Sequence, residues 1–378
     1  MSVKEYFLHG LFNQHSGDKK ILQSQLHWTL RVTAALCFIG HGTWGLITKS
    51  GWLPFFASQG IEPEIAWSMQ PLIGAFDILM AILLLRGSNR AILIWMFLWA
   101  LWTAILRPLA GNLEKVEIDG EWVVQLATDS MRVAKMQTWE FWERAGNWGP
   151  PFMLLVMGGA FAITRKDLFS NYQEPEIKES TINTVFFLSK TCLALLLIGH
   201  GGFGFAVEKQ MLINHWQSIG VDADVAFITQ IGYGELALGV LIFLAPVRPL
   251  IFLALFWKLF TEFLYVPADT VTGMGIVNIF EWIERWGDYG IPLAMLYIDS
   301  FRKAKSWTSY RGFCLFRIRP FPRGCLLPEP KFFGLLLPLR DFLWLRHPER
   351  FSQERFSARQ FLPYISNQFP QFLLFVLR

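Results

Sequence analysis

Eight long apolar runs, separated by short polar stretches, occupy most of the first 301 residues of the chain. A transmembrane helix requires about 20 mainly apolar residues, so the pattern predicts eight membrane-spanning helices. They are expected at Trp28–Thr48, Ala66–Leu85, Ala91–Ala110, Trp148–Thr164, Thr184–Val207, Ala226–Pro246, Arg248–Ala268 and Gly287–Phe301. Two shorter segments, Gly51–Glu64 and Met211–Asp224, are predicted to be interfacial, partly helical connectors.

The same blocks of sequence occur twice, in the same order. Ile39–Gly42 (Ile-Gly-His-Gly) returns as Ile198–Gly201, and Leu101-Trp102-Thr103 returns as Leu259-Phe260-Thr261. The acids Asp77 and Glu235 correspond, and Glu140–Pro151 returns as Glu281–Pro292. This repetition predicts two fused four-helix units, residues 28–166 and residues 184–303. Because each unit has four spans, both should have the same orientation in the membrane.

Composition supports a membrane protein rather than a soluble one. Hydrophobic residues make up 53% of the chain and charged residues only 17%, whereas soluble proteins carry about 25% charged residues. Many of the 17 tryptophans lie near the ends of apolar runs, as in interfacial aromatic belts. The fold class is therefore all-α and polytopic, with the lipid bilayer as the main partner and no indication of nucleic-acid binding.

Basic residues in short loops predict the orientation, because such residues mark the cytoplasmic side. Every such loop falls on one side of the eight-helix topology, and the opposite side carries acid-rich loops. The basic positions are Lys19, Lys20, Arg86, Arg90, Arg165, Lys166, Lys178, Arg248, Arg302, Lys303 and Lys305. We therefore expect a multi-pass protein of the inner (plasma) membrane with both termini in the cytoplasm, and residues 1–27 form a cytoplasmic segment without a secretory signal.

The last segment, residues 306–378, is rich in Arg, Phe and Pro and lacks helical periodicity. Its prolines would interrupt any long helix. Two interpretations are open: a disordered extension on the membrane surface, or out-of-frame translation after a frameshift near Lys305. We favour the second and expect no functional residue there.

Ionisable residues inside or beside the apolar runs are the candidate site, because charges in lipid are costly and are usually retained for function. Recurrence in both copies selects His41, His200, Asp77, Glu235, Glu140 and Glu281. Equal predicted depth leads us to expect that His41 contacts Asp77 and that His200 contacts Glu235. On the seventh helix, Lys258 and Glu262 are spaced for an i,i+4 ion pair.

The two histidines allow three interpretations. A buried imidazole can be hydrogen-bonded to a carboxylate and join two helices. It can handle protons, since histidine titrates near neutrality, or it can ligate haem or a metal. Neither His41 nor His200 has a second ligand residue at i+3 or i+4, so no metal site is predicted and ligation of haem is the least favoured of the three.

The Glu-x-x-Glu-Arg block has a structural interpretation as well. In each copy the adjacent Glu-Arg residues, Glu143-Arg144 and Glu284-Arg285, are expected to pair locally at a helix start. Glutamates at a helix start also suit its positive dipole. Under this interpretation Glu140 and Glu281 are left as the better functional candidates.

Each half of residues 28–301 resembles the DoxX-like family of four-helix membrane proteins. The resemblance rests on Phe38-Ile39-Gly40-His41-Gly42 and on a second helix with an embedded acid, Ile73–Asp77 or Ile231–Glu235. It implies a small inner-membrane protein, linked in some members to quinone-coupled sulfur oxidation or oxidative-stress complexes. The Glu-Arg-Gly-Pro block is not a general feature of that family.

Three functions follow as hypotheses. The first is a redox- or quinone-linked membrane subunit, with a redox partner subunit and a His/acid layer that handles protons in the outer half of the membrane. The second is a proton-coupled carrier, and the third is a non-catalytic scaffold. A quinone site requires an apolar cleft beside His41 or His200, and a carrier requires a polar cavity that reaches the midplane. A scaffold requires each histidine and acid to be paired in packing that excludes water. Whether the protein is an enzyme stays open at this stage.

Overall fold

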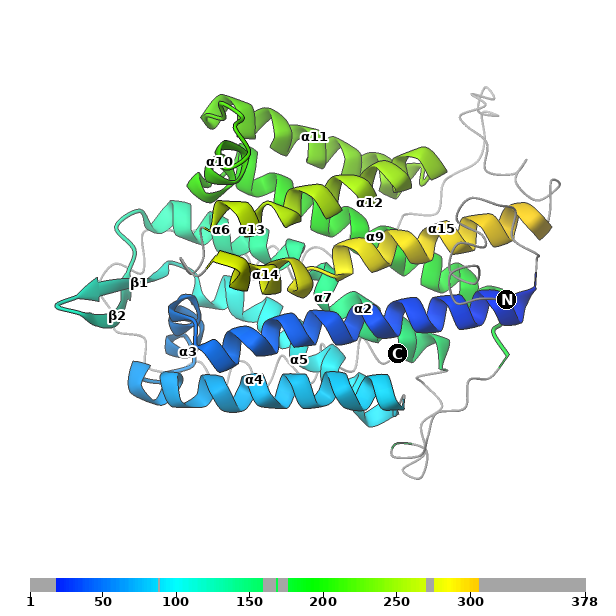
Figure 1. The fold of residues 1–378 in the computed structure, drawn as a ribbon, viewed down its shortest axis with the longest axis horizontal. Helices are drawn as coiled ribbons and strands as arrows, with labels where there is room; N and C mark the ends of the chain where they lie inside the picture. Colours follow the sequence, from blue (N-terminus) through cyan, green and yellow to red (C-terminus); the bar gives the residue numbers. More distant parts are fainter. Residues whose placement is uncertain (1–17, 88, 159–167, 169–175, 270–274, 306–378) are drawn as a thin grey trace, which may run out of the picture. The chain divides into compact units, whose positions relative to one another are not determined.

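The computed structural model describes residues 18–87, 89–158, 168, 176–269 and 275–305 (Figure 1). Within these residues six helical segments are long and apolar enough to cross a membrane. They are α2 (Lys19–Ile47), α4 (Pro63–Arg86), α5 (Arg90–Ala110), α9 (Glu179–Phe205), α11 (Val225–Leu244) and the segment Arg248–Ala268, which comprises α12 (Arg248–Phe263) and α13 (Tyr265–Ala268). The protein is therefore a helical membrane protein, as its composition predicts.

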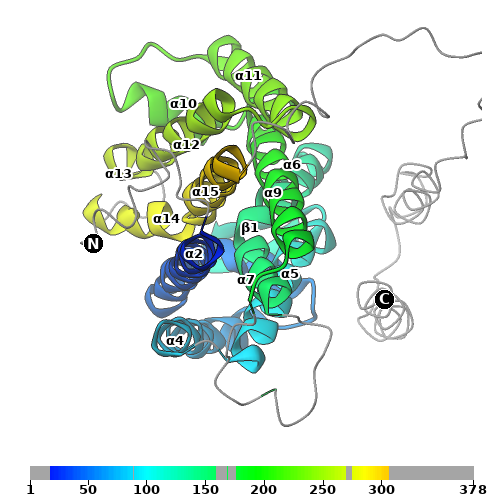
Figure 2. The same ribbon diagram turned by 90° about the vertical axis from the view of Figure 1, so that its right-hand side faces the viewer.

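The two predicted fourth helices are central to the bundle but are not among these six segments. α7 (Ala145–Met157) and α15 (Gly287–Lys305) both contact α2 and α9, and Figure 2 shows all four helices in the middle of the bundle. α7 begins three residues before the predicted start at Trp148, and its predicted end lies outside the described residues, as do Arg165 and Lys166. Residues 1–17 and 306–378, for which the sequence predicts a cytoplasmic segment and a tail without functional residues, also lie outside the described residues.

α7 and α15 each follow another helix after a kink. α6 (Ser130–Glu143) precedes α7, and α14 (Ile279–Glu284) precedes α15. Arg144 closes the last turn of α6, and Arg285 does the same for α14. The remaining helical pieces are η1 (Ser50–Trp52), α3 (Leu53–Ala57), α10 (Gln210–Gln217) and η2 (Gly275–Asn278).

A β-hairpin lies between α5 and α6, where the sequence predicted only an acid-rich loop. Antiparallel strands β1 (Leu113–Ile118) and β2 (Glu121–Leu126) are joined by Asp119 and Gly120, whose φ angles are 52° and 83°. Asp-Gly is the preferred pair for such a two-residue turn, so this local signal was present in the sequence. The second half lacks a corresponding hairpin in its described residues.

Glycines allow the close approach of helices within each half. Gly42 and Gly45 of α2 face Gly74 of α4, and a Cβ on Gly74 would lie 2.3 Å from the carbonyl oxygen of Gly42. In the second half, Gly201 packs against Gly232 in the same way. Side chains at these positions would separate the helices.

Glycines also join one half to the other. A Cβ on Gly40 of α2 would lie 2.3 Å from the backbone nitrogen of Glu284. A Cβ on Gly199 of α9 would lie 2.3 Å from the nitrogen of Glu143. The first helix of each half is therefore packed against the Glu-Arg kink of the other half.

The outer helices carry the surface suited to lipid. Large exposed apolar side chains are concentrated on α4, α11 and α12, which surround the central helices in Figure 2. Such an extensive apolar surface is unusual on a soluble protein. The start of α2 and the end of α15 lie at one end of the bundle, and the hairpin lies at the other (Figure 1).

Candidate functional site

A histidine–acid pair joins the first two helices of each half. His41 Nδ1 lies 2.8 Å from Asp77 Oδ2, and His200 Nδ1 lies 2.6 Å from Glu235 Oε2. Both carboxylates are buried, with exposed fractions of 1% and 3%. The predicted contacts are therefore confirmed, and in each half they lie beside the glycine crossing of the two helices.

In the second half the pair is extended on both sides. His200 Nε2 lies 3.4 Å from Glu262 Oε1, so the imidazole lies between two carboxylates. The indole Nε1 of Trp257 donates to Glu235 Oε1 at 2.7 Å. An imidazolium can donate from both ring nitrogens, so this arrangement suits a histidine that gains and loses a proton.

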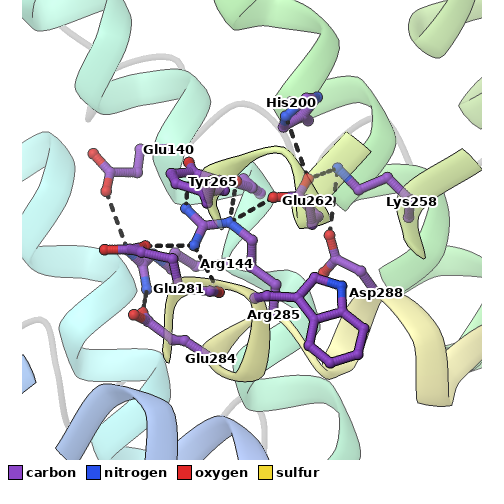
Figure 3. Close-up of polar contacts among 12 residues, drawn as sticks. Glu140, Arg144, His200, Lys258, Glu262, Tyr265, Glu281, Glu284, Arg285 and Asp288 are labelled. Atoms are coloured by element: carbon purple, nitrogen blue, oxygen red, sulfur yellow. Dashed lines mark hydrogen bonds and ion pairs between the residues drawn. The ribbon is translucent and has the colours of Figure 1, made fainter. Parts of the chain in front are cut away.

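A fully buried lysine completes this side of the site. Lys258 pairs with Glu262, as the i,i+4 spacing predicted, and its Nζ lies 3.4 Å from Asp288 Oδ2 (Figure 3). Arg285 Nε also lies 2.8 Å from Glu262 Oε2. Because burying an unpaired charge is costly, these residues require one another.

The kink arginines pair across the two halves, and the expected local Glu-Arg pairing is wrong. Arg144 bonds Glu284 of the second half (Figure 3). Arg285 Nε lies 3.8 Å from Glu143 Oε1 of the first half. The two kinks meet at Gly146 and Gly287. A Cβ on Gly287 would lie 2.0 Å from the carbonyl oxygen of Gly146, and a Cβ on Gly146 would lie 2.9 Å from Asp288 Oδ1. This close contact brings each arginine to the carboxylate of the other half.

The structure places Glu140 and Glu281 in ion pairs rather than beside either histidine. Glu140 Oε1 lies 3.2 Å from Arg144 and 3.4 Å from Arg107. Burial raises the pKa of Glu140, but Arg107 and Arg144 outweigh burial and hold that pKa at about 2. Glu281 bonds Lys49 and Arg285. These cations likewise overcome burial and lower its pKa.

We call these connected charges the ionic layer. Its acids are Asp77, Glu140, Glu143, Glu235, Glu262, Glu281, Glu284 and Asp288, and its lysines and arginines are Lys49, Arg107, Arg144, Lys209, Lys258 and Arg285. The carboxyl groups outnumber these cations by two. Two histidines, one in each half, can supply the missing positive charge when they are protonated.

A cavity opens beside His200, with a volume of about 360 Å³ that includes its mouth. Its polar lining comes from His200, Glu235, Thr261 and His215, and its apolar lining includes Leu212 and Trp216 of α10. The Thr261 hydroxyl is buried and has no hydrogen-bond partner among the described residues. The lining therefore combines apolar walls with convergent polar groups, as small-molecule sites do.

The two halves differ here because their connectors differ. Aligning the Ser-x-Gly sequences of the connectors pairs Trp52 with Leu212 and Phe55 with His215. Trp52 stacks on His41 with ring centroids 4.6 Å apart, whereas the smaller Leu212 leaves space beside His200. Residue-by-residue alignment of the connectors could have revealed this difference, but we did not identify these residues from the sequence.

His215 was likewise missed by the sequence reasoning. It lies on α10, outside the six membrane-length segments, and its ring meets that of Tyr265 with centroids 4.4 Å apart. Burial lowers the pKa of His215 to about 3. This imidazole is therefore neutral at physiological pH.

No group of three or more His, Cys, Asp or Glu side chains in the described part of the chain could hold a metal ion. Cys37 and Cys192 are buried free thiols within α2 and α9. The chemistry that this arrangement supports is proton exchange and hydrogen bonding.

Comparison with known proteins assigns no family to the chain. No protein-family model matches it, and neither does any curated protein or solved structure.

Proposed function

We propose that this protein is a DoxX-like membrane protein with two fused four-helix units and eight spans, and that it binds the ring of a lipid-soluble quinone beside His200. Glu235 and His200 exchange protons with the bound ring. A redox partner subunit supplies or accepts the electrons, because reduction of a quinone to a quinol consumes two electrons and two protons. The protein is a component of the inner membrane with both termini in the cytoplasm.

The observation that carries this proposal is the cavity beside the doubly flanked His200. Leu212 and Trp216 give it apolar walls, and the free Thr261 hydroxyl gives it a hydrogen-bond donor for a ring oxygen. Glu235, which receives a hydrogen bond from Trp257, also lines the space. A proton donor within reach of a ring oxygen is what acid–base chemistry on a quinone requires.

Duplication is supported by matched contacts. Each half has a His–acid bond between its first two helices, a glycine crossing at that bond, and a first helix packed on the other half's kink. The buried α7 and α15 supply the fourth and eighth spans of the proposed topology because they complete the centre of the bundle.

Filling the cavity tests the proposal. Leu212→Trp places in the second half the residue that the first half has at Trp52, and we expect it to abolish saturable binding of a short-chain ubiquinone to the purified full chain in nanodiscs. Binding is measured by the ligand-dependent rise in melting temperature. Trp52→Leu is the matched control and should retain the saturable binding beside His200. Quinone binding that survives in a folded Leu212→Trp variant would contradict the proposal.

A non-catalytic scaffold is the second candidate, because every carboxylate of the ionic layer has a basic partner within 4.0 Å. Under this alternative, the layer only holds helices together. Absence of quinone binding to the wild type, combined with loss of folding when ion pairs are removed, would favour the scaffold.

A further inference from the structure

Two buried aspartates of α15 differ in their partners. Asp288 and Asp299 are each only 3% exposed. Asp299 Oδ2 lies 3.1 Å from Arg248 and 2.9 Å from Lys303, so two cations balance its charge. Among the described residues, Asp288 Oδ2 has no hydrogen-bond partner and pairs only with Lys258, at 3.4 Å. The two carboxyl groups are therefore equally buried but unequally neutralised.

The ammonium of Lys258 is shared between two carboxyl groups. It bonds Glu262 directly, and Asp288 is its second, more distant partner (Figure 3). Lys258 and Glu262 are both completely buried. Asp288 therefore depends on a cation that already bonds another carboxylate. A buried carboxyl group without a cation of its own avoids the large cost of the charge by taking up a proton.

The start of α15 does not supply the missing positive charge. A helix start favours an acid because its first amide groups have no partners within the helix. Here the amides of Asp288, Tyr289 and Gly290 donate to carbonyl oxygens of the kink, at distances of 2.9 to 3.2 Å. Hydrogen bonds thus continue through the kink into α15, and these amide groups are not available to the carboxylate.

The other ionisable groups around Asp288 do not supply that charge either. The groups that face it are Lys258 and Glu262 of α12, Glu143 of α6, Arg285 of the kink, Cys37 of α2 and Tyr289 of α15. Two of them are carboxyl groups and two are cations, whereas a thiol and a phenol are neutral at physiological pH. These surroundings therefore have no excess of positive charge to balance an ionised Asp288.

The first half keeps the helices but lacks all three groups. By the sequence repeat, Ala100 corresponds to Lys258, Ala104 to Glu262 and Asn147 to Asp288. The histidine–acid bond and the glycine crossing nevertheless form in that half as well. A half therefore does not need this cluster in order to fold, which favours a role in handling charge.

We propose that Lys258, Glu262 and Asp288 form a proton-storage site, in which Asp288 holds a proton while His200 is neutral. Asp288 gives this proton to Lys258 Nζ as the ammonium gives one to Glu262. Glu262 Oε1 lies 3.4 Å from His200 Nε2, and passes its proton to that nitrogen. The net result is an Asp288 carboxylate and a His200 imidazolium, with Lys258 and Glu262 unchanged. The site requires no quinone and exists in the ligand-free protein.

Infrared spectroscopy tests the proposal directly, because the carbonyl band of a protonated carboxyl group lies apart from the bands of carboxylates and amides. The full chain is measured at pH 7.5 without quinone, in a maltoside detergent that contains no carbonyl group. We expect a wild-type band that moves when aspartate is ¹³C-labelled at its side-chain carboxyl group. Asp288→Asn, which introduces the residue of the first half, should remove this band. Asp299→Asn is the matched control on the same helix and should keep it.

Glu262→Gln tests whether the proton is shared. Without the Glu262 carboxylate, Lys258 is left to Asp288, so Asp288 should ionise and the band should disappear although the aspartate is intact. A band that persists in Glu262→Gln would show that burial of Asp288 alone holds the proton, and would overturn the shared site. Absence of the band from the wild type, or its persistence in Asp288→Asn, would also overturn the proposal. These two results decide the matter if Glu262→Gln does not fold.

Discussion

The two halves of this protein share the same arrangement of helices but differ in the side chains on both sides of their histidines. In the first half Trp52 covers His41, and a hollow remains beside Ala100. In the second half Lys258 occupies the space that corresponds to that hollow, and the cavity lies instead beside Leu212. A repeated framework has therefore produced two chemically different sites through a few changes of side-chain size and charge.

What the halves keep in common is equally informative. Each first helix meets the kink of the other half, and each kink arginine reaches a carboxylate across that contact. The shared elements hold the halves together, whereas the differing elements line the cavities.

Removing a kink arginine should destabilise the protein most. Arg144→Ala removes the ion pairs of Arg144 with Glu140 and Glu284. Arg285→Ala removes those of Arg285 with Glu262 and Glu281. Breaking a buried ion pair by removing one partner costs about 3–5 kcal/mol. We expect a large fall in melting temperature or loss of folded protein for both variants. A change of less than about 1 kcal/mol in either would mean that the ionic layer does not hold the halves together.

His215→Phe introduces the residue of the first half, Phe55, and should change the acid sensitivity. The pKa of the folded-state imidazole is lowered to about 3 by burial, against about 6.5 in the unfolded chain. The unfolded state therefore binds the extra proton as the pH falls below 6.5, and stability decreases from there towards pH 3. At pH 5 this contribution is about 2 kcal/mol.

The measurement is the melting temperature of wild type and His215→Phe at pH 7.5 and at pH 5. The wild type should lose more stability than the variant over this interval. Phe55→His is the reciprocal change in the first half and should increase acid sensitivity. Equal losses in wild type and His215→Phe would show that His215 titrates normally.

Amide substitutions of the two histidine-bonded acids should have the smallest effect on stability. Asp77→Asn and Glu235→Gln keep a hydrogen-bonding group at each position but remove the exchangeable proton. Such bonds in membrane proteins contribute about 0.6 kcal/mol on average, so both variants should melt close to wild type. Asp77→Leu and Glu235→Leu should damage stability as well, because each removes the carboxylate that bonds the Nδ1 of a histidine.

The sequence predicted the contacts within each half better than those between halves. Joint recurrence of a histidine and an acid was enough to pair His41 with Asp77, and helical spacing was enough to pair Lys258 with Glu262. A repeat, however, does not reveal which copy supplies a partner. Arg144 was therefore assigned to its neighbour rather than to Glu284.

The cavities could not be derived from periodicity. A hollow depends on the difference between a large and a small side chain at one position, such as Trp52 and Leu212, and both residues fit the same apolar pattern. The β-hairpin at Asp119-Gly120 was also not predicted, but for a different reason. Its Asp-Gly turn signal is local, so the sequence alone was sufficient to predict it.

The central claim is that proton exchange accompanies quinone binding in the second half only. Calorimetric titration of the full chain with a short-chain ubiquinol, in two buffers of different ionisation enthalpy, measures the protons exchanged on binding. We expect the wild type and Asp77→Asn to exchange protons, and Glu235→Gln to bind without exchange. Buffer-independent heats in the wild type, or exchange that persists in Glu235→Gln, would contradict the account.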